Sequence, residues 1–129
     1  MSKLRHIALA VDNLQETAAF YEQAFGMQRV RESPVAVMLS DGVVSLAIID
    51  LQRNANAGNA RPGLHHFGFL VDDLDTASAQ VEQAGGQYHG QIQNVGAAQN
   101  TERKYRDVNG VVFDIVNREH AERIWRIPA

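Results

Sequence analysis

The 129-residue chain contains no cysteine, which excludes a disulfide framework, a thiolate metal ligand and a thiol nucleophile. It has no cluster of lysines and arginines, and its formal net charge of −3 gives no electrostatic basis for binding nucleic acid. Long apolar runs are missing too, because nothing approaches the length of a membrane span and the start, MSKLRHIALAV, is too short an apolar stretch for a signal peptide. We therefore expect a soluble, cytoplasmic protein with neither nucleic acid nor membrane as a partner.

What the chain does contain is typical of a folded domain. Hydrophobic residues make up 45% and charged residues 21%, which are globular averages and argue against disorder. The length suits a single domain, residues 1–129, with enough apolar side chains to form a core.

An internal repeat is the strongest signal. Residues 6–26 (HIALAVDNLQETAAFYEQAFG) align with residues 66–86 (HFGFLVDDLDTASAQVEQAGG) at an offset of 60, with nine identities in 21 positions. A repeat of this length indicates two copies of one supersecondary unit. Each copy opens with a histidine, His6 or His66.

The start of each copy alternates with period two, which predicts a strand with two different faces. One face is bulky and apolar and suits packing under a helix. The other carries the histidine followed by small residues, which leaves space above the strand: His6, Ala8 and Ala10 in the first copy, and His66, Gly68 and Leu70 in the second.

A helix and three strands follow in each copy. Leu14, Ala18, Tyr21 and Phe25 fall on one helical stripe, and Gly26 suits the end of that helix. Turn residues then separate short strand candidates, at 28–32, 35–39 and 43–49 in the first copy and at 87–91, 104–107 and 111–116 in the second. The prediction is an α+β fold: two βαβββ modules form a curved mixed sheet around a metal- or ligand-binding cleft.

The remaining segments connect or end these modules. We expect module 1 at about 1–51, a polar linker at 52–63, module 2 at about 64–117 and a C-terminal helix at 118–126. The polar loop 92–101 is a candidate lid. His120 lies among charged residues and is expected to be solvated, and the sequence does not indicate where Trp125 packs.

A carboxylate interrupts the last apolar run, Val-Val-Phe-Asp-Ile-Val. Asp114 follows the turn residue Gly110 by four positions, and a buried carboxylate there requires a partner or a cation. An ion pair with Arg106 is one alternative. The same count from Gly42 in the first module reaches Leu46, so His6, Leu46, His66 and Asp114 are predicted to correspond, and three of them can bind metal.

These elements resemble the vicinal oxygen chelate superfamily, which includes glyoxalase I, bleomycin-resistance proteins, extradiol dioxygenases and methylmalonyl-CoA epimerases. LRHIALAVDNL, LHHFGFLVDDLD and YRDVNGVVFDIV match the family's first, fifth and last strands, and the likeness covers nearly the whole chain. It implies metal ligands at His6, His66 and Asp114, with Asp114 in place of the usual glutamate. It also implies a small-molecule substrate and a homodimer.

The resemblance implies a divalent metal, with Fe(II) first and Mn(II), Zn(II) or Ni(II) as alternatives. Leu46 departs from the four-ligand site of glyoxalases and epimerases. Two histidines and one carboxylate instead form a facial triad with open positions, the pattern of ring-cleaving dioxygenases. The alternatives are a glyoxalase-like lyase or isomerase and a metal-free ligand-sequestering protein of the bleomycin-resistance type.

Other residues are weaker candidates. His89 is a candidate acid–base group, and Tyr105 is near a position where some extradiol enzymes carry a tyrosine, although an ordinary structural aromatic is the alternative. His65 is expected on the opposite side of its strand from His66, in a structural role. Strand alternation predicts a small, apolar site lining of Ala8, Ala10, Gly68, Leu46 and Val112.

Overall fold

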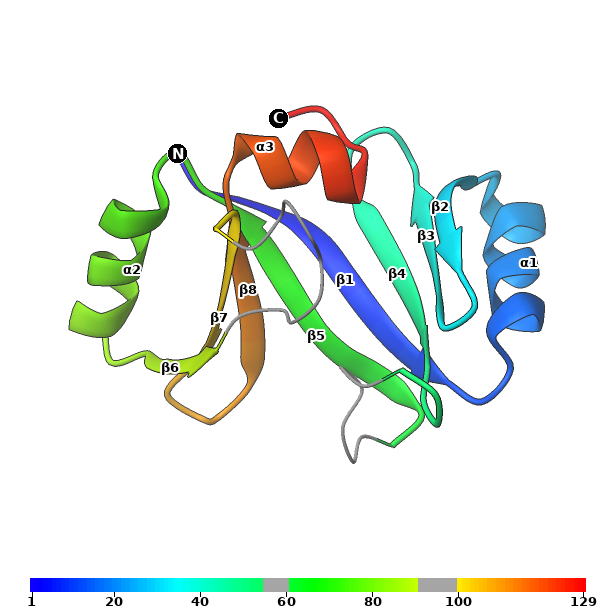
Figure 1. Cartoon of the computed structure of the whole chain (residues 1–129), viewed down its shortest axis with the longest axis horizontal. Helices are drawn as coiled ribbons and strands as arrows, with labels where there is room; N and C mark the ends of the chain where they lie inside the picture. Colours follow the sequence, from blue (N-terminus) through cyan, green and yellow to red (C-terminus); the bar gives the residue numbers. More distant parts are fainter. Residues whose placement is uncertain (55–60, 91–99) are drawn as a thin grey trace.

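The computed structural model describes residues 1–54, 61–90 and 100–129. They form an eight-stranded sheet in the order β2-β3-β4-β1-β5-β8-β7-β6. Figure 1 shows a curved sheet with α1 near one end, α2 near the other and the C-terminal helix α3 between them. The predicted α+β fold of two βαβββ modules is confirmed. We call the sheet face opposite α1 and α2 the inner face.

Each module repeats one element order. The first strand of each module begins three residues before its histidine, and the other strands begin and end within two residues of the predicted positions. The first module consists of β1 (Lys3–Val11), α1 (Leu14–Phe25), β2 (Gln28–Ser33), β3 (Ala36–Ser40) and β4 (Ser45–Asp50). The second consists of β5 (Gly63–Leu70), α2 (Leu74–Gln83), β6 (Gln87–Gly90), β7 (Glu102–Arg106) and β8 (Val112–Val116). Residues 92–99 of the loop proposed as a lid and residues 55–60 of the linker lie outside the described residues.

The first and last strands of each module pair in parallel. In the first module β1 pairs with β4, and in the second β5 pairs with β8. The two modules join within one chain, because β1 pairs antiparallel with β5. This junction brings both repeat histidines to the middle of the sheet.

Apolar side chains of the outer face pack under the helices. Leu14 and Ala18 of α1 cover Val37, Leu39 and Ile48 of the first module. In the second module α2 covers a cluster that is partly aromatic, with Val71, Leu74, Ala77, Tyr105, Phe113 and Ile115 at its centre. The helices therefore occupy the outer face and leave the inner face for other contacts.

The C-terminal segment packs on part of the inner face. Its helix α3 (Arg118–His120) continues as a wider, π-helical turn, η3 (Ala121–Trp125). The Asn117 side chain caps α3 by accepting a hydrogen bond from the His120 backbone N–H at 3.1 Å. Trp125 packs with Leu70 and Val116 at the ends of β5 and β8. Among the described residues, no helix is long and apolar enough to span a membrane.

Candidate metal centre

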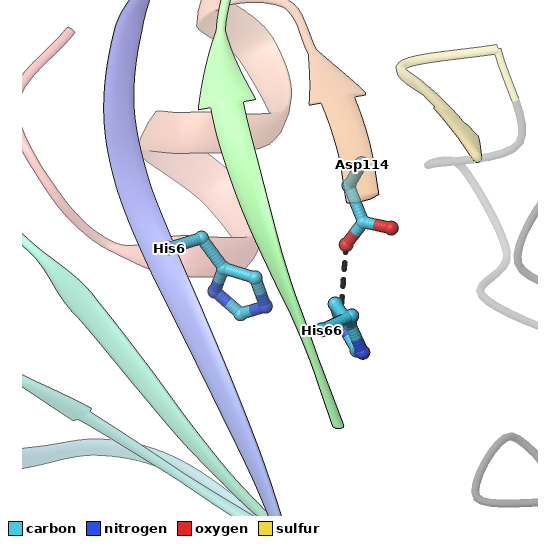
Figure 2. Close-up of side chains that lie close together, drawn as sticks. All are labelled: His6, His66 and Asp114. Atoms are coloured by element: carbon cyan, nitrogen blue, oxygen red, sulfur yellow. Dashed lines mark ion pairs between the residues drawn. The ribbon is translucent and has the colours of Figure 1, made fainter. Parts of the chain in front are cut away.

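Three side chains with metal-binding chemistry meet on the inner face. His6 lies on β1, His66 on β5 and Asp114 on β8, and these three strands are neighbours in the sheet. One ligand atom of each residue lies within 4.8 Å of those of the other two. The Nε2 atom of His66 and the Oδ2 atom of Asp114 are 3.1 Å apart, and Figure 2 shows the His6 ring turned toward this pair.

The strand register explains why there is room for these side chains. His6 lies opposite Gly68, His66 lies opposite Ala8, and Asp114 pairs with Gly68. Each potential ligand therefore has a very small residue beside it on the next strand. The small inner-face residues of the sequence repeat are what allow two imidazoles and a carboxylate to converge.

Both histidines have a partner at Nδ1. The Nδ1 atom of His6 is 3.0 Å from the Ser45 hydroxyl, and the Nδ1 atom of His66 is 2.7 Å from the Nδ1 atom of His65. These contacts leave Nε2 of each ring for a ligand. A partner at the second ring nitrogen is the usual way in which a protein fixes the tautomer and orientation of a metal-binding histidine.

The placement of His65 corrects the prediction from strand alternation. Its ring contacts His66 edge-on, with centroids 4.9 Å apart, so it does not lie across the strand from its neighbour. The β1–β5 register shifts at this point: Ala8 pairs with His66 but Leu9 pairs with Leu64. His65 is thus the extra residue of a β-bulge, and a bulge interrupts the alternation of side chains.

Asp114 is buried and paired with a lysine. Its side chain is 1% exposed, and its Oδ1 atom accepts a hydrogen bond from the Lys104 ammonium at 2.5 Å. Burial alone would raise the pKa of Asp114, but Lys104 and then His66 outweigh burial and hold the pKa below its usual value. The partner is therefore Lys104 and not Arg106, whose guanidinium instead donates to His89 and the Gly110 carbonyl.

His6 is held in the neutral form that binds metals. Burial lowers the pKa of His6 to about 3, and the nearby Asp114 carboxylate opposes this effect only in part. A neutral imidazole has a lone pair on one ring nitrogen, and the Ser45 contact leaves Nε2 to carry it.

The fourth position of the repeat is Ala47, and its assignment to Leu46 is wrong. Asp114 pairs with Gly68, whose repeat counterpart is Ala8, and Ala8 pairs with Ala47. Leu46 points to the outer face, where it packs in the cluster under α1. Counting from the turn glycine missed by one residue, and a shift of one residue moves a side chain to the other face. Ala47, like Leu46, has no side-chain atom that could bind a metal.

A tryptophan from the C-terminal segment covers His6. The two rings stack with centroids 4.5 Å apart and 6° between their planes. Gly68 makes this contact feasible, because a Cβ atom there would lie 3.1 Å from two atoms of the Trp125 ring. Trp125 therefore forms one wall of the centre.

A second group of buried polar residues adjoins the centre. His120, predicted to be solvated, is 1% exposed, and its Nδ1 atom is 2.9 Å from the Thr101 hydroxyl. Its Nε2 atom lies 3.7 Å from the buried carboxylate of Glu102, which is itself 4.0 Å from the Lys104 ammonium. Burial lowers the pKa of His120 to about 4. The solvation prediction failed because α3 docks this side chain against the sheet.

The structure does not bring the two weaker candidates into the triad. Tyr105 is buried in the cluster under α2 and donates a hydrogen bond to Glu82 at 3.2 Å, on the outer face. His89 is an exposed residue of β6, at the far edge of the sheet, where it accepts a hydrogen bond from Arg106. Tyr105 therefore lies on the face away from the three converging ligand atoms, and His89 lies two strands from Asp114, near enough for Lys104 and Asp114 to affect its pKa.

Four residues of this region were missed by sequence reasoning: Ser45, Glu102, Lys104 and Trp125. Alternation along β7 contained a usable signal for two of them. Once Tyr105 is assigned to the outer face, Lys104 and Glu102 fall on the same face as Asp114. Ser45 and Trp125 gave no comparable signal, because their contacts with His6 depend on strand pairing and on docking of the chain end.

The triad fits a divalent cation in its donor set and its charge. Two imidazole nitrogens and one carboxylate are the ligands of the 2-His-1-carboxylate sites of Fe(II) proteins. The 3.1 Å separation of His66 Nε2 and Asp114 Oδ2 suits two ligands of one ion, since each would lie about 2.1 Å from it. The Asp114 carboxylate supplies the negative charge that a divalent cation requires among the three ligands.

Comparisons with known proteins agree with the fold. The family model of the Glyoxalase/Bleomycin resistance protein/Dioxygenase superfamily matches residues 3–115, which is most of the sequence. The chain belongs to this superfamily. No curated protein sequence matches it.

Several solved structures share the superfamily fold. A hypothetical protein from Bacillus halodurans C-125 is 18% identical, with a TM-score of 0.71 and coverage of 90% of this chain and 94% of that one. A methylmalonyl-CoA epimerase in complex with methylmalonyl-CoA and NH4+ is 23% identical, with a TM-score of 0.68 and coverage of 91% and 94%. The epimerase of Mycobacterium tuberculosis is 21% identical, with a TM-score of 0.67 and coverage of 88% and 86%. At these identities the likeness is one of fold.

Proposed function

We propose that this member of the superfamily binds one divalent metal ion through His6 Nε2, His66 Nε2 and Asp114, and that it acts on a small organic substrate. The convergence of the three ligand atoms within 4.8 Å supports the site. The Nδ1 contacts with Ser45 and His65 support it too, because they hold both rings with Nε2 available.

We further propose a reaction like that of ring-cleaving, extradiol-type dioxygenases, with Fe(II) as the favoured metal. The observation that carries this proposal is Ala47 at the fourth position of the repeat, because a methyl group supplies no ligand. A three-ligand site leaves coordination positions for a substrate with two neighbouring oxygens and for dioxygen. When bound, such a metal acts as a Lewis acid and lowers the pKa of a substrate hydroxyl.

Residues around the triad would orient the metal ligands and enclose the substrate. Ser45 and His65 hold the imidazoles, and the Lys104 ammonium contacts the Oδ1 atom of Asp114. Trp125 covers one side of His6 and restricts access from that direction. The small neighbours Ala8 and Gly68 leave space on the inner face, which suits a compact aromatic or alkyl substrate.

A second candidate function is metal-free binding of a small ligand, of the kind attributed to bleomycin-resistance proteins. The observation that favours it is the pairing of Asp114 with Lys104, since an ammonium already neutralises the carboxylate without any metal. A glyoxalase-like lyase or isomerase is less well supported, because Ala47 cannot complete a four-ligand site. The homodimer, the cytoplasmic location and the single domain over 1–129 remain predictions.

Metal binding by purified protein tests the proposal. We expect one equivalent of Fe(II), Mn(II) or Zn(II) per chain, and loss of binding in His6→Ala, His66→Ala and Asp114→Ala. His89→Ala, an exposed histidine change outside the triad, is the matched control and should bind as the unmodified protein does. Unchanged metal content in all three triad variants would contradict the site.

A second experiment addresses the reaction class. Nitric oxide added without oxygen to the Fe(II)-loaded protein is expected to give an iron–nitrosyl signal in electron paramagnetic resonance, which a catechol then alters. The signal would support open coordination positions. Tight metal binding without such a signal would count against dioxygenase chemistry, and no metal binding would favour the metal-free candidate.

A further inference from the structure

Lys104 is a buried cation in direct contact with a proposed metal ligand. Its side chain is 14% exposed, and its Nζ atom lies 2.5 Å from Asp114 Oδ1. It is brought there by strand pairing, because Lys104 on β7 is the direct partner of Asp114 on β8. The other Asp114 oxygen, Oδ2, faces His66. A metal bound between His66 and Oδ2 would therefore share the Asp114 carboxylate with the ammonium at Oδ1.

The same ammonium has a second acidic neighbour. The Oε1 atom of Glu102 lies 4.0 Å from Lys104 Nζ, and the Glu102 side chain is 2% exposed. Two carboxylates at these distances favour the charged form of a lysine. If the ammonium loses its contact with Asp114, Glu102 is near enough to become its main acidic neighbour.

A charged lysine at this point has an electrostatic consequence for a metal ion. A divalent cation bound to Asp114 would lie within a few ångströms of the ammonium, and like charges at such distances repel strongly where water is scarce. In the absence of metal, the same ammonium prevents Asp114 from being a buried, uncompensated charge.

We propose that Lys104 is the resident cation of this centre: it balances Asp114 in the metal-free protein and competes with a metal ion for that carboxylate. This role rests on the proposed metal site. It makes Lys104, a residue outside the triad, a determinant of how tightly that site binds metal. Metal binding then displaces the ammonium toward Glu102. A lysine that merely held Asp114 in position would have the opposite effect, since its loss would weaken metal binding.

Calorimetric titration of chelator-treated protein with Zn(II) distinguishes these roles, because loss of the Lys104 charge raises the Zn(II) affinity in one case and lowers it in the other. We expect Lys104→Met, which keeps the chain length and removes the charge, to bind Zn(II) at least tenfold more tightly than the unmodified protein. Lys104→Arg keeps the charge and is expected to stay close to the unmodified protein. Lys3→Met removes the other lysine of the chain, which is exposed and on β1, and should leave the affinity unchanged.

The titration separates failure of the Lys104 role from failure of the metal site. Equal or weaker binding by Lys104→Met overturns the resident-cation role but leaves the proposed metal site. Binding by Lys104→Met alone supports the role and contradicts a metal-dependent function of the natural protein. No binding by either protein overturns both.

A measurement on the unmodified protein covers the case in which Lys104→Met does not fold. The chain has two lysines, so a lysine labelled with 13C at Cε gives two resonances in a nuclear magnetic resonance spectrum. Saturating Zn(II) is expected to shift the Lys104 resonance and leave that of Lys3 in place. An unmoved Lys104 resonance at saturation would contradict the displacement.

Discussion

The indole of Trp125 and the imidazole of His6 stack nearly in parallel, with centroids 4.5 Å apart. The contact joins the C-terminal turn η3 to the first strand of the chain, and so it connects the two ends of the sequence at the candidate metal centre. Trp125 is 1% exposed, which means that the indole belongs to the folded interior. Because the chain has a single tryptophan, this contact makes the centre observable by fluorescence.

Metal binding should therefore quench the fluorescence of Trp125. We expect Co(II) or Ni(II) titrated into the protein to reduce the emission, since either ion bound to His6 would lie close to the stacked indole. The reduction should saturate at one equivalent and reverse with a chelator. Asp114→Asn keeps His6 and its stacking but weakens the site, so its quenching should require more metal. Quenching that is identical in this variant would place the metal elsewhere.

The stacking also predicts an effect of Gly68→Ala. A Cβ atom at this position would lie 3.1 Å from Trp125 Cη2 and Cζ2 and 3.2 Å from His6 Cβ. Such overpacking is expected to lower the free energy of unfolding by about 1–3 kcal/mol, measured by urea denaturation. In the Trp125→Phe background the smaller ring leaves room, so the added cost of Gly68→Ala should shrink. If the costs of Gly68→Ala and Trp125→Phe simply add in the double variant, the two residues are not coupled.

The repeat explains how much of the fold and the site could be predicted. His6 and His66 open two copies of one unit, and the alternation after each histidine indicates both the strand and the face on which the side chain lies. Asp114 stood out because a carboxylate in an apolar run needs a partner. These signals are local, and the structure brings the three residues together.

The errors arose where strand pairing matters. The bulge that places His65 beside His66 adds one residue to one strand, and no local pattern marks it. The choice between Leu46 and Ala47 depends on the register of β1 with β4, and one residue reverses the face. The burial of His120 depends on where the chain end docks, which is a contact between distant segments.

The corrected fourth position can be tested by adding a ligand. We expect Ala47→Glu to raise the affinity for Zn(II) at least tenfold, because the new carboxylate would occupy the repeat counterpart of Asp114. The matched control is Leu46→Glu, which points into the cluster under α1. That change should destabilise the protein, because it places a charge in a partly buried apolar cluster, and it should not raise metal affinity. Tighter Zn(II) binding by Leu46→Glu and not by Ala47→Glu would show that Leu46, and not Ala47, is the fourth position.

Ser45 and His65 are expected to act as positioning residues. Ser45→Ala and His65→Phe each remove the partner of a histidine Nδ1 atom, and loss of such a partner typically weakens metal binding 10–100-fold. The absorption spectrum of the Co(II) form should change as well, because the ring orientation is no longer fixed. Ser40→Ala, at the residue that pairs with Ser45 on β3, is the control and should retain both properties. Loss of stability with unaltered metal affinity would indicate a purely structural role.

His120 predicts acid sensitivity of the metal-free protein. Its pKa is about 4 in the folded state, because burial disfavours the charged ring, whereas the unfolded value is 6.5. The unfolded state therefore binds more protons than the folded state between these two values. The contribution of neutral His120 to the free energy of unfolding is complete above about pH 6.5 and is lost as the pH falls toward 4. The loss is about 1.4 kcal/mol per pH unit for each such histidine, and His6, whose pKa is also lowered, adds to the slope. Urea unfolding of chelator-treated protein from pH 7 to pH 4 measures it. His120→Gln removes the titrating ring and should reduce the slope by roughly half, whereas an unchanged slope would mean that other groups cause the acid sensitivity.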